Sequence, residues 1–140
     1  MSKKGYLLDT HILVWYLQDK TKLRQDLAED IDYFQYAFYV SVASLHEIIF
    51  LIQEKKIKNH KNISAIIKAV QEKQMHLLDV TPKHIETLEK LSTPLIGKDP
   101  HKDQFDRTLI SQAIAEGLTL ISSDTVFPLY KDRGFKLLEN

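Results

Sequence analysis

The chain of 140 residues contains no cysteine, and it has only four glycines and four prolines. The lack of cysteine excludes a disulfide framework, a cysteine-ligated zinc site and thiol catalysis, and it is typical of proteins from a reducing compartment. The scarcity of glycine and proline argues against flexible linkers between domains. Residues 1–140 are therefore expected to form a single domain.

An excess of charge of one sign is also missing. Nineteen Lys and Arg balance nineteen Asp and Glu, so the formal net charge is zero, which excludes a polycationic nucleic-acid-binding arm. No apolar run approaches the ~20 residues that span a bilayer. The first residues meet charge at Lys3 and Lys4 and an acid at Asp9, a pattern unlike a signal peptide. A soluble cytoplasmic domain without membrane contact is expected.

Short apolar runs alternate with longer amphipathic segments. The runs rich in β-branched and aromatic residues predict strands at 6–8, 38–42, 77–80 and 118–122, with 135–138 as a candidate fifth. Apolar residues at helical spacing, together with start and stop signals, predict helices at 12–17, after the second strand, at 62–73, from Pro82 onward and at 108–116. Strands separated by helices need crossover connections, so the fold class is α/β with a mostly parallel sheet and helices on both faces.

Carboxylates fall at the ends of these predicted elements. Asp9 ends the first strand, and Asp124 follows the fourth. Glu47 is expected in the first turn of the helix after the second strand, and Asp106, with Asp103 nearby, opens the helix before the fourth. Ligands bind outside the carboxyl ends of the strands in open parallel sheets. We therefore expect Asp9, Glu47, Asp106 and Asp124 on one edge of the sheet.

Each acid also has a purely structural interpretation as a helix cap. Ser44 and Glu47 fit a capping box, and Asp103, Asp9 and Asp124 each fit the start of a following helix. Taken singly, each position favours the cap, because helix starts favour acids in general. The joint pattern, from four segments spread over most of the chain, favours a shared site.

Converging carboxylates require a positive partner. Two carboxylates ~4 Å apart repel by ~1 kcal/mol in water and by ~4 kcal/mol at an effective dielectric constant of ~20. Oxygen ligands without cysteine or a His-rich spacing favour Mg²⁺ or Mn²⁺ over zinc. Such an ion polarises phosphate oxygens, and a pair of ions would clamp an in-line displacement. The predicted chemistry is hydrolysis or transfer at phosphorus, with the number of ions left open.

Four segments of the chain resemble the PIN domain and, more narrowly, the VapC-like toxins of bacterial type II toxin–antitoxin pairs. They are residues 7–11 (LLDTH), 42–47 (VASLHE), 103–113 (DQFDRTLISQA) and 120–124 (LISSD). The resemblance implies a three-layer α/β/α sandwich with a four- to five-stranded sheet. It also implies an Mg²⁺- or Mn²⁺-dependent endoribonuclease that forms a homodimer and is held inactive by an antitoxin protein, which often places a basic side chain near the acids.

The resemblance also implies roles for individual residues. Asp9, Glu47, Asp106 and Asp124 would be the catalytic acids, with Asp9 and Asp106 as direct metal ligands and Glu47 and Asp124 binding metal directly or through water. A metal-bound water would attack the RNA phosphodiester. Supporting roles would fall to Asp103, Thr10, Ser122, whose hydroxyl would orient a carboxylate or water, and Arg107, which would contact phosphate or pair with an acid.

Three positions depart from the family pattern. His46 stands where Trp is usual, Gln104 replaces a Pro, and Leu51 replaces a Lys. None of these changes removes a carboxylate, so the predicted metal site is unaffected, while RNA contacts and substrate preference stay open.

A basic segment and an aromatic segment have less specific patterns. Lys55, Lys56 and Lys58 are candidates for RNA-backbone contacts or, equally, for a solvated helix end. Residues 33–39 hold five of the twelve Phe and Tyr residues and are expected mostly in the core, with the remainder at a dimer or partner surface. His11 is expected to serve helix packing rather than to line the site.

Two other functions compete with the nuclease. One is a non-cleaving PIN-like domain that binds RNA or protein, although all four acids are present. The other is a phosphoacceptor signalling domain, which needs a pair of acids at the end of the first strand. Thr10 and His11 follow Asp9 instead, so this function is disfavoured.

Overall fold

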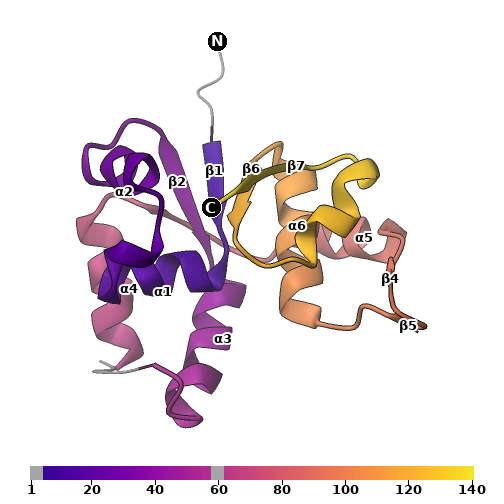
Figure 1. The fold of residues 1–140 in the computed structure, drawn as a ribbon, viewed down its shortest axis with the longest axis horizontal. Coiled ribbons are helices and arrows are strands. Elements are labelled where there is room, and N and C mark those ends of the chain that lie inside the picture. The colour runs from indigo at the N-terminus through magenta and orange to yellow at the C-terminus, as the bar shows by residue number, and fades with distance from the viewer. Residues whose placement is uncertain (1–4, 58–61) are drawn as a thin grey trace.

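The computed structural model describes residues 5–57 and 62–140 and contains a central five-stranded sheet (Figure 1). The strands lie in the order β3-β2-β1-β6-β7, and each adjacent pair is parallel. Their bounds are β1 Gly5–Leu8, β2 Ala37–Ser41, β3 His76–Leu78, β6 Thr119–Ser122 and β7 Lys136–Glu139. A separate antiparallel hairpin joins β4 Leu95–Ile96 to β5 Asp99–Pro100. The predicted α/β class is confirmed, and the candidate fifth strand is present as β7.

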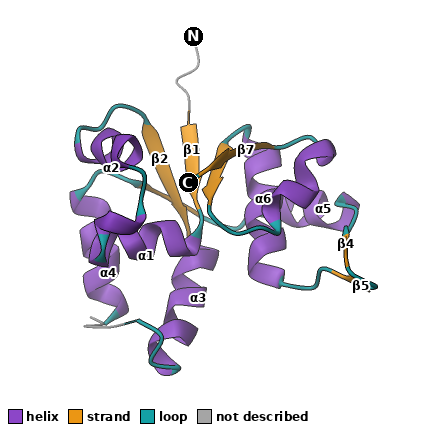
Figure 2. Cartoon of the chain, viewed as in Figure 1, coloured by secondary structure: helices purple, strands orange, loops and turns teal. Residues whose placement is uncertain are grey.

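Helices connect the strands and flank the sheet on both sides (Figure 2). The α-helices are α1 Thr10–Gln18, α2 Gln25–Asp32, α3 Val42–Gln53, α4 Ile63–Glu72, α5 Pro82–Lys90 and α6 Gln104–Glu116. Two 3₁₀ segments, η1 Lys20–Lys22 and η2 Phe127–Arg133, complete the described part of the chain. None of the helices within residues 5–57 and 62–140 combines the length and the apolar character needed to cross a bilayer.

Alternate residues of the strands face opposite layers. Leu8 of β1 belongs to a buried cluster with side chains of α1, α2, α3 and α4, whereas its neighbour Leu7 belongs to a second cluster with α6 and η2. This alternation is the period-two geometry of a strand buried on both faces. The three-layer α/β/α sandwich implied by the family resemblance is thus confirmed.

Capping side chains set several helix boundaries as expected. Thr81 caps α5 in a capping box with His84, and Pro82 occupies the first turn. Gly117 ends α6 in the left-handed region at φ 67°, which glycine adopts without a steric penalty.

The start of α3 differs from the expectation. Ser41, the last residue of β2, caps α3 by accepting a hydrogen bond from the Ala43 N–H, so the helix begins without a loop. The capping-box interpretation of Ser44 and Glu47 is wrong, and Glu47 lies one turn further into the helix than expected. Ser44 is buried and accepts a hydrogen bond from Thr10 Oγ1 instead, which ties α3 to α1.

The aromatic segment 33–39 is less buried than predicted. Phe38 in β2 is 4% exposed, but Tyr33 is 72% and Phe34 49% exposed. Tyr33 is the C-cap of α2, and Phe34 adopts a φ of 55°, so both residues lie in the turn that precedes β2. The alternation of buried and exposed residues that a strand imposes begins only in β2, so these two side chains stay at the surface.

Candidate functional site

Asp9 occupies the carboxyl end of β1 and is 5% exposed. Its Oδ1 accepts a hydrogen bond from the Thr10 N–H at 2.7 Å, so it caps α1, and its Oδ2 accepts one from Ser122 Oγ at 2.8 Å. Burial raises the pKa of Asp9 to about 6, opposed by the Ser122 hydrogen bond and the nearby charge of His11. The carboxylate therefore serves as a cap and also lies in an environment that penalises its charge.

Asp106 lies in the first turn of α6, and its side chain is 13% exposed. Burial is the largest cause that raises its pKa, to about 8, and the charges of neighbouring acids add to it. These neighbours are Asp103, Asp9, Asp124 and Glu47. Acids from β1, α3, α6 and the loop after β6 thus act electrostatically on one carboxyl group.

Ser122 links two of these acids. Its hydroxyl donates to Asp9, and the same oxygen accepts a hydrogen bond from the Asp124 N–H at 3.0 Å. Asp124 Oδ1 accepts in turn from the Val126 N–H at 3.1 Å. The last residue of β6 therefore orients the carboxylate of the neighbouring strand and the backbone of the following loop.

A buried hydrogen-bond chain reaches Asp106 from η2. His101, which is 7% exposed, places Nε2 3.2 Å from Asp106 Oδ2 and Nδ1 2.8 Å from the hydroxyl of the fully buried Tyr130. Arg107 donates to that hydroxyl at 3.0 Å, which leaves the phenol proton free to be donated to His101 Nδ1. In that arrangement the neutral imidazole carries its proton on Nε2, from which it can be donated to Asp106 Oδ2. Burial is the largest cause that lowers the pKa of His101, which favours this neutral form.

Sequence reasoning missed His101. It stands five residues before Asp106 in the loop that leads to α6, and no ligand spacing distinguishes it from the other histidines. Its role depends on Tyr130, a distant residue that only the tertiary fold brings near. A His a few residues before a predicted site acid was the one signal available.

The remaining predicted residues have varied surroundings. Asp103 caps α6 by accepting from the Asp106 N–H at 3.0 Å. Arg107 donates to the Leu91 carbonyl as well as to Tyr130 rather than to an acid, and its contact with phosphate stays a prediction. His11 is exposed, and its ring centroid lies 6.1 Å from that of Trp15, one turn along α1, so its expected packing role stays a prediction.

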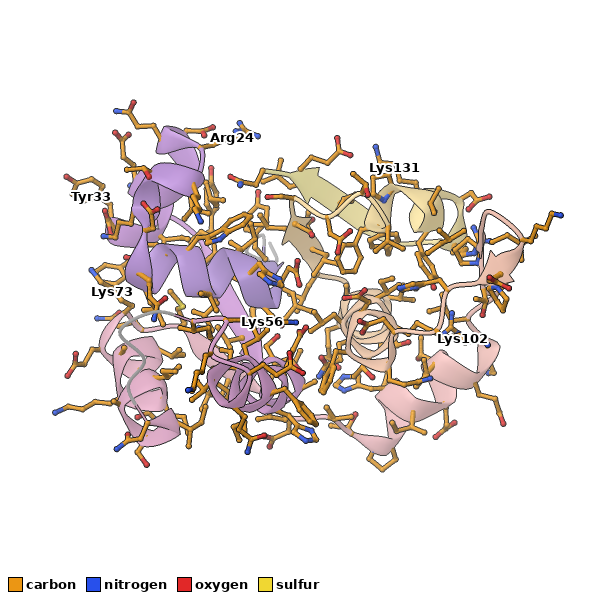
Figure 3. All side chains as sticks on the ribbon, turned by 60° about the horizontal axis from the view of Figure 1, so that its bottom comes forward. Arg24, Tyr33, Lys56, Lys73, Lys102 and Lys131 are labelled. Carbon is orange, nitrogen blue, oxygen red and sulfur yellow. The ribbon has the colours of Figure 1, made fainter. Side chains whose placement is uncertain are left out.

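The predicted basic segment is only partly described. Lys56 forms an ion pair with Glu54 at 2.8 Å, and Lys55 follows α3 with a φ of 56°. Lys58 lies outside the described residues. Figure 3 shows Lys56 over the α1–α3 part of the molecule and Lys102 over the α5–α6 part.

The arrangement and the chemistry of the acids differ in how well they fit a divalent ion. Within the described ranges, no three His, Asp or Glu side chains form a group that could hold a metal. Hydrogen bonds to Ser122, Thr10 and His101 hold the oxygens of Asp9 and Asp106 in their present orientations. The donor chemistry nevertheless fits a hard cation, because the acids offer only oxygen and because positive charge would offset the burial and the repulsion that together raise both pKa values. The assignment of individual ligands stays a prediction.

One cavity lies away from these acids. It has a volume of about 720 Å³, and its walls come from the segments that lead into β2 and β3, including Phe34, Tyr36, Lys73 and His76. It is therefore at the amino end of the strands, opposite the edge that carries Asp9 and Asp124.

Comparisons with known proteins agree with this architecture. No curated protein sequence matches the chain. Its fold is similar to that of VapBC2 from Rickettsia felis bound to a DNA fragment from their promoter, with a TM-score of 0.73, 20% identity, and coverage of 96% of this chain and 98% of that chain. DNA-bound VapBC from Salmonella typhimurium gives a TM-score of 0.68 and 13% identity, with 97% of this chain and 98% of that chain covered. VapBC-1 from nontypeable Haemophilus influenzae gives a TM-score of 0.63 and 15% identity, with 96% of this chain and 97% of that chain covered. At these identities the likeness shows the fold.

The family resemblance noted in the sequence has independent support. A family model of the PIN domain matches residues 6–132, which is most of the chain. The matched range includes Asp9, Glu47, Asp106 and Asp124. The protein belongs to the PIN domain family.

Proposed function

We propose that this protein is a divalent-metal-dependent endoribonuclease and the toxin of a type II toxin–antitoxin pair. Membership of the PIN family and a fold similar to that of VapBC proteins support the proposal. The observation that carries it is the convergence of charge on Asp106, whose pKa is raised to about 8 by burial and by four neighbouring acids. Acids gathered in this way retain a proton or bind a cation, and carboxyl groups with such raised pKa values are concentrated at functional sites.

The proposed mechanism assigns a task to each side chain. Asp9 and Asp106 would hold Mg²⁺ or Mn²⁺ directly, and Glu47 and Asp124 would hold it directly or through water. When bound, the ion supplies an activated water and polarises the scissile phosphate. Ser122 orients Asp9 through its 2.8 Å hydrogen bond, and His101 orients Asp106. Such supporting hydrogen bonds fix the direction in which a carboxylate presents its free lone pairs.

An antitoxin partner follows from the same electrostatics. A basic side chain inserted among Asp9, Asp106 and their neighbours would relieve their mutual repulsion and would compete with the metal ion for their oxygens. VapBC complexes share this fold. A short open reading frame immediately upstream that encodes a DNA-binding antitoxin would support the toxin function. A homodimer, as in VapC-like toxins, is also part of the proposal.

The test is cleavage of total RNA by the purified protein. Samples would contain Mg²⁺, Mn²⁺ or a chelator, and sequencing of the new ends would identify the cut sites. We expect cuts with either metal, none with the chelator, and none with Asp9→Asn or Asp106→Asn. Glu86→Gln, which removes an exposed charge from α5, is the matched control and should cut normally.

One observation favours a non-cleaving PIN-like binding domain instead. No group of three potential ligands is arranged for a metal ion in the described part of the chain. This alternative predicts that RNA binds but that its ends do not change under any metal condition. The same sequencing experiment therefore distinguishes the two functions.

A further inference from the structure

Three aromatic rings form a continuous surface across α3 and α6. His46 and Phe50, one turn apart on α3, stack with ring centroids 5.6 Å apart and an interplanar angle of 28°. Phe105, in the first turn of α6, meets His46 edge-on at 5.4 Å and Phe50 at 6.1 Å. We call these three side chains the aromatic surface.

The aromatic surface is not part of either buried cluster. Phe50 is 48% exposed, His46 is exposed and Phe105 is half-buried. Large apolar side chains at the surface cost free energy that burial against a ligand would recover. A ligand that covered the aromatic surface would therefore gain this free energy.

Its place in the chain ties the aromatic surface to the acids. His46 directly precedes Glu47, and Phe105 directly precedes Asp106, so each helix contributes a ring and an acid at consecutive positions. Glu47 is close enough to Asp106 for its charge to raise the pKa of that carboxyl group. A molecule that covers the rings therefore lies over the same two helices that carry Glu47 and Asp106.

Chemistry narrows the occupant to a nucleobase. The rings carry no fixed charge and stand beside acids that repel phosphate, so they cannot hold the backbone of an RNA. Every base has a π-face that stacks on aromatic side chains, and a base exposes that face only when it is unpaired. Three rings suit one or two bases, whereas a stable protein dimer needs roughly 800 Å² from each partner.

We infer that the aromatic surface of His46, Phe50 and Phe105 binds an unpaired base next to the scissile phosphate. The inference deepens the proposed ribonuclease function and rests on it for the position of the phosphate. Stacking of the base itself requires neither the metal nor the acids.

A metal-free NMR titration tests the stacking directly. The protein in chelator would be titrated with the dinucleotide ApA and, in parallel, with the corresponding abasic sugar–phosphate. We expect upfield shifts of the ring protons of His46, Phe50 and Phe105 with ApA only. Shifts of equal size with the abasic compound, or no shifts with ApA, would overturn the inference.

Variants separate stacking from structural damage. Phe50→Ala should weaken ApA binding about tenfold or more, the scale of one lost stacking contact, whereas Phe50→Tyr should retain it. Tyr33→Ala removes an aromatic side chain that is 72% exposed at the end of α2 and should bind ApA normally. Weakening of ApA binding by the same factor in Tyr33→Ala and Phe50→Ala would contradict a specific surface.

Ring-proton shifts that depend on protein concentration in the absence of any ligand would show that a second copy covers the rings, and the inference would fail.

Cleavage assays keep this inference apart from the proposed function. If the wild type cuts RNA, Phe50→Ala should raise KM for a single-stranded substrate about tenfold with kcat nearly unchanged. If the wild type cuts nothing while ApA still shifts the rings, the nuclease function fails and the base-binding surface stands. If the wild type cuts RNA but ApA does not shift the ring protons, only the base-binding surface is disproved.

Discussion

Ser122 Oγ donates a 2.8 Å hydrogen bond to Asp9 Oδ2 across a sequence separation of 113 residues. The contact exists because β1 and β6 are parallel neighbours with Leu8 opposite Ile121, which places the next residue of each strand at the same edge. The hydrogen bond favours the charged form of Asp9 against the burial that disfavours it. This pair therefore sets how readily Asp9 presents a negative charge.

Ser122→Ala should raise the pKa of Asp9 above its present value of about 6, because the hydrogen bond that lowers it is lost. The free energy of unfolding should fall by about 1–3 kcal/mol at pH 8, the scale of a hydrogen bond to a charged group. An NMR titration of the Asp9 side-chain carboxyl carbon and urea unfolding would measure both effects. Ser123→Ala, which removes an exposed hydroxyl bonded to Asn140, is the control and should leave the Asp9 titration unchanged.

The contribution of Asp9 and Asp106 to the stability of the metal-free protein should fall as pH rises from about 4 to about 8, whereas the lowered pKa of His101 acts in the opposite direction below the usual His pKa of 6.5. Asp9 and Asp106 have folded-state pKa values of about 6 and about 8, above the 3.8 of an unfolded Asp, so the folded state binds protons more tightly. Their unfavourable contribution is absent below pH 4 and grows through this range. A pKa difference of one between folded and unfolded states corresponds to about 1.4 kcal/mol.

Asp106→Asn removes the larger of these contributions. The variant should melt at a higher temperature than the wild type at pH 8 without metal, and its stability should vary less between pH 4 and pH 8. Thermal unfolding across this pH range would measure the difference, with Glu86→Gln as the control that keeps the wild-type slope. A lower melting temperature for Asp106→Asn at pH 8 would refute the repulsion among the acids.

The main elements and the positions of the acids were predictable because local patterns determine them. The alternation at Leu7 and Leu8, the cap at Thr81 and the stop at Gly117 are all encoded within a few residues. The family motifs likewise consist of short contiguous segments. These features required no knowledge of how distant parts of the chain meet.

Features that depend on tertiary contacts were missed. Ser44 has the sequence context of a cap, but its hydroxyl oxygen instead accepts a hydrogen bond from Thr10, which belongs to another helix. His101 and Tyr130 are 29 residues apart, and only the packing of η2 against α6 brings them together. Their chemistry could not be predicted from local periodicity, because neither residue lies at a patterned position relative to the other.

His101 should support metal binding through its hydrogen bond to Asp106. His101→Ala removes the donor and should weaken Mn²⁺ binding about tenfold, as is typical when a partner of a ligating carboxylate is lost. His101→Gln keeps an N–H where Nε2 stands and should recover part of the affinity, while Tyr130→Phe should lower it because the imidazole loses the contact that fixes its proton. Calorimetric titration with Mn²⁺ gives these affinities independently of cleavage. Equal affinities in Ala, Gln and wild type would mean that His101 is only a packing residue.

Lys55, Lys56 and Lys58 changed together to Glu should weaken RNA binding more at low salt than at high salt, if the segment after α3 contacts phosphates. Each phosphate contact contributes about one to the slope of log affinity against log salt, so the slope should fall by up to about three. Lys56 already pairs with the exposed Glu54, so its contribution to the salt slope should be the smallest.

Fluorescence anisotropy with a labelled single-stranded RNA in chelator would measure the RNA affinities across a series of salt concentrations. The same change at Lys83, Lys90 and Lys98, three exposed lysines of the α5 and hairpin region, is the charge-matched control. Identical salt slopes for the two triple variants would mean that the basic segment is a solvated helix end and does not contact RNA.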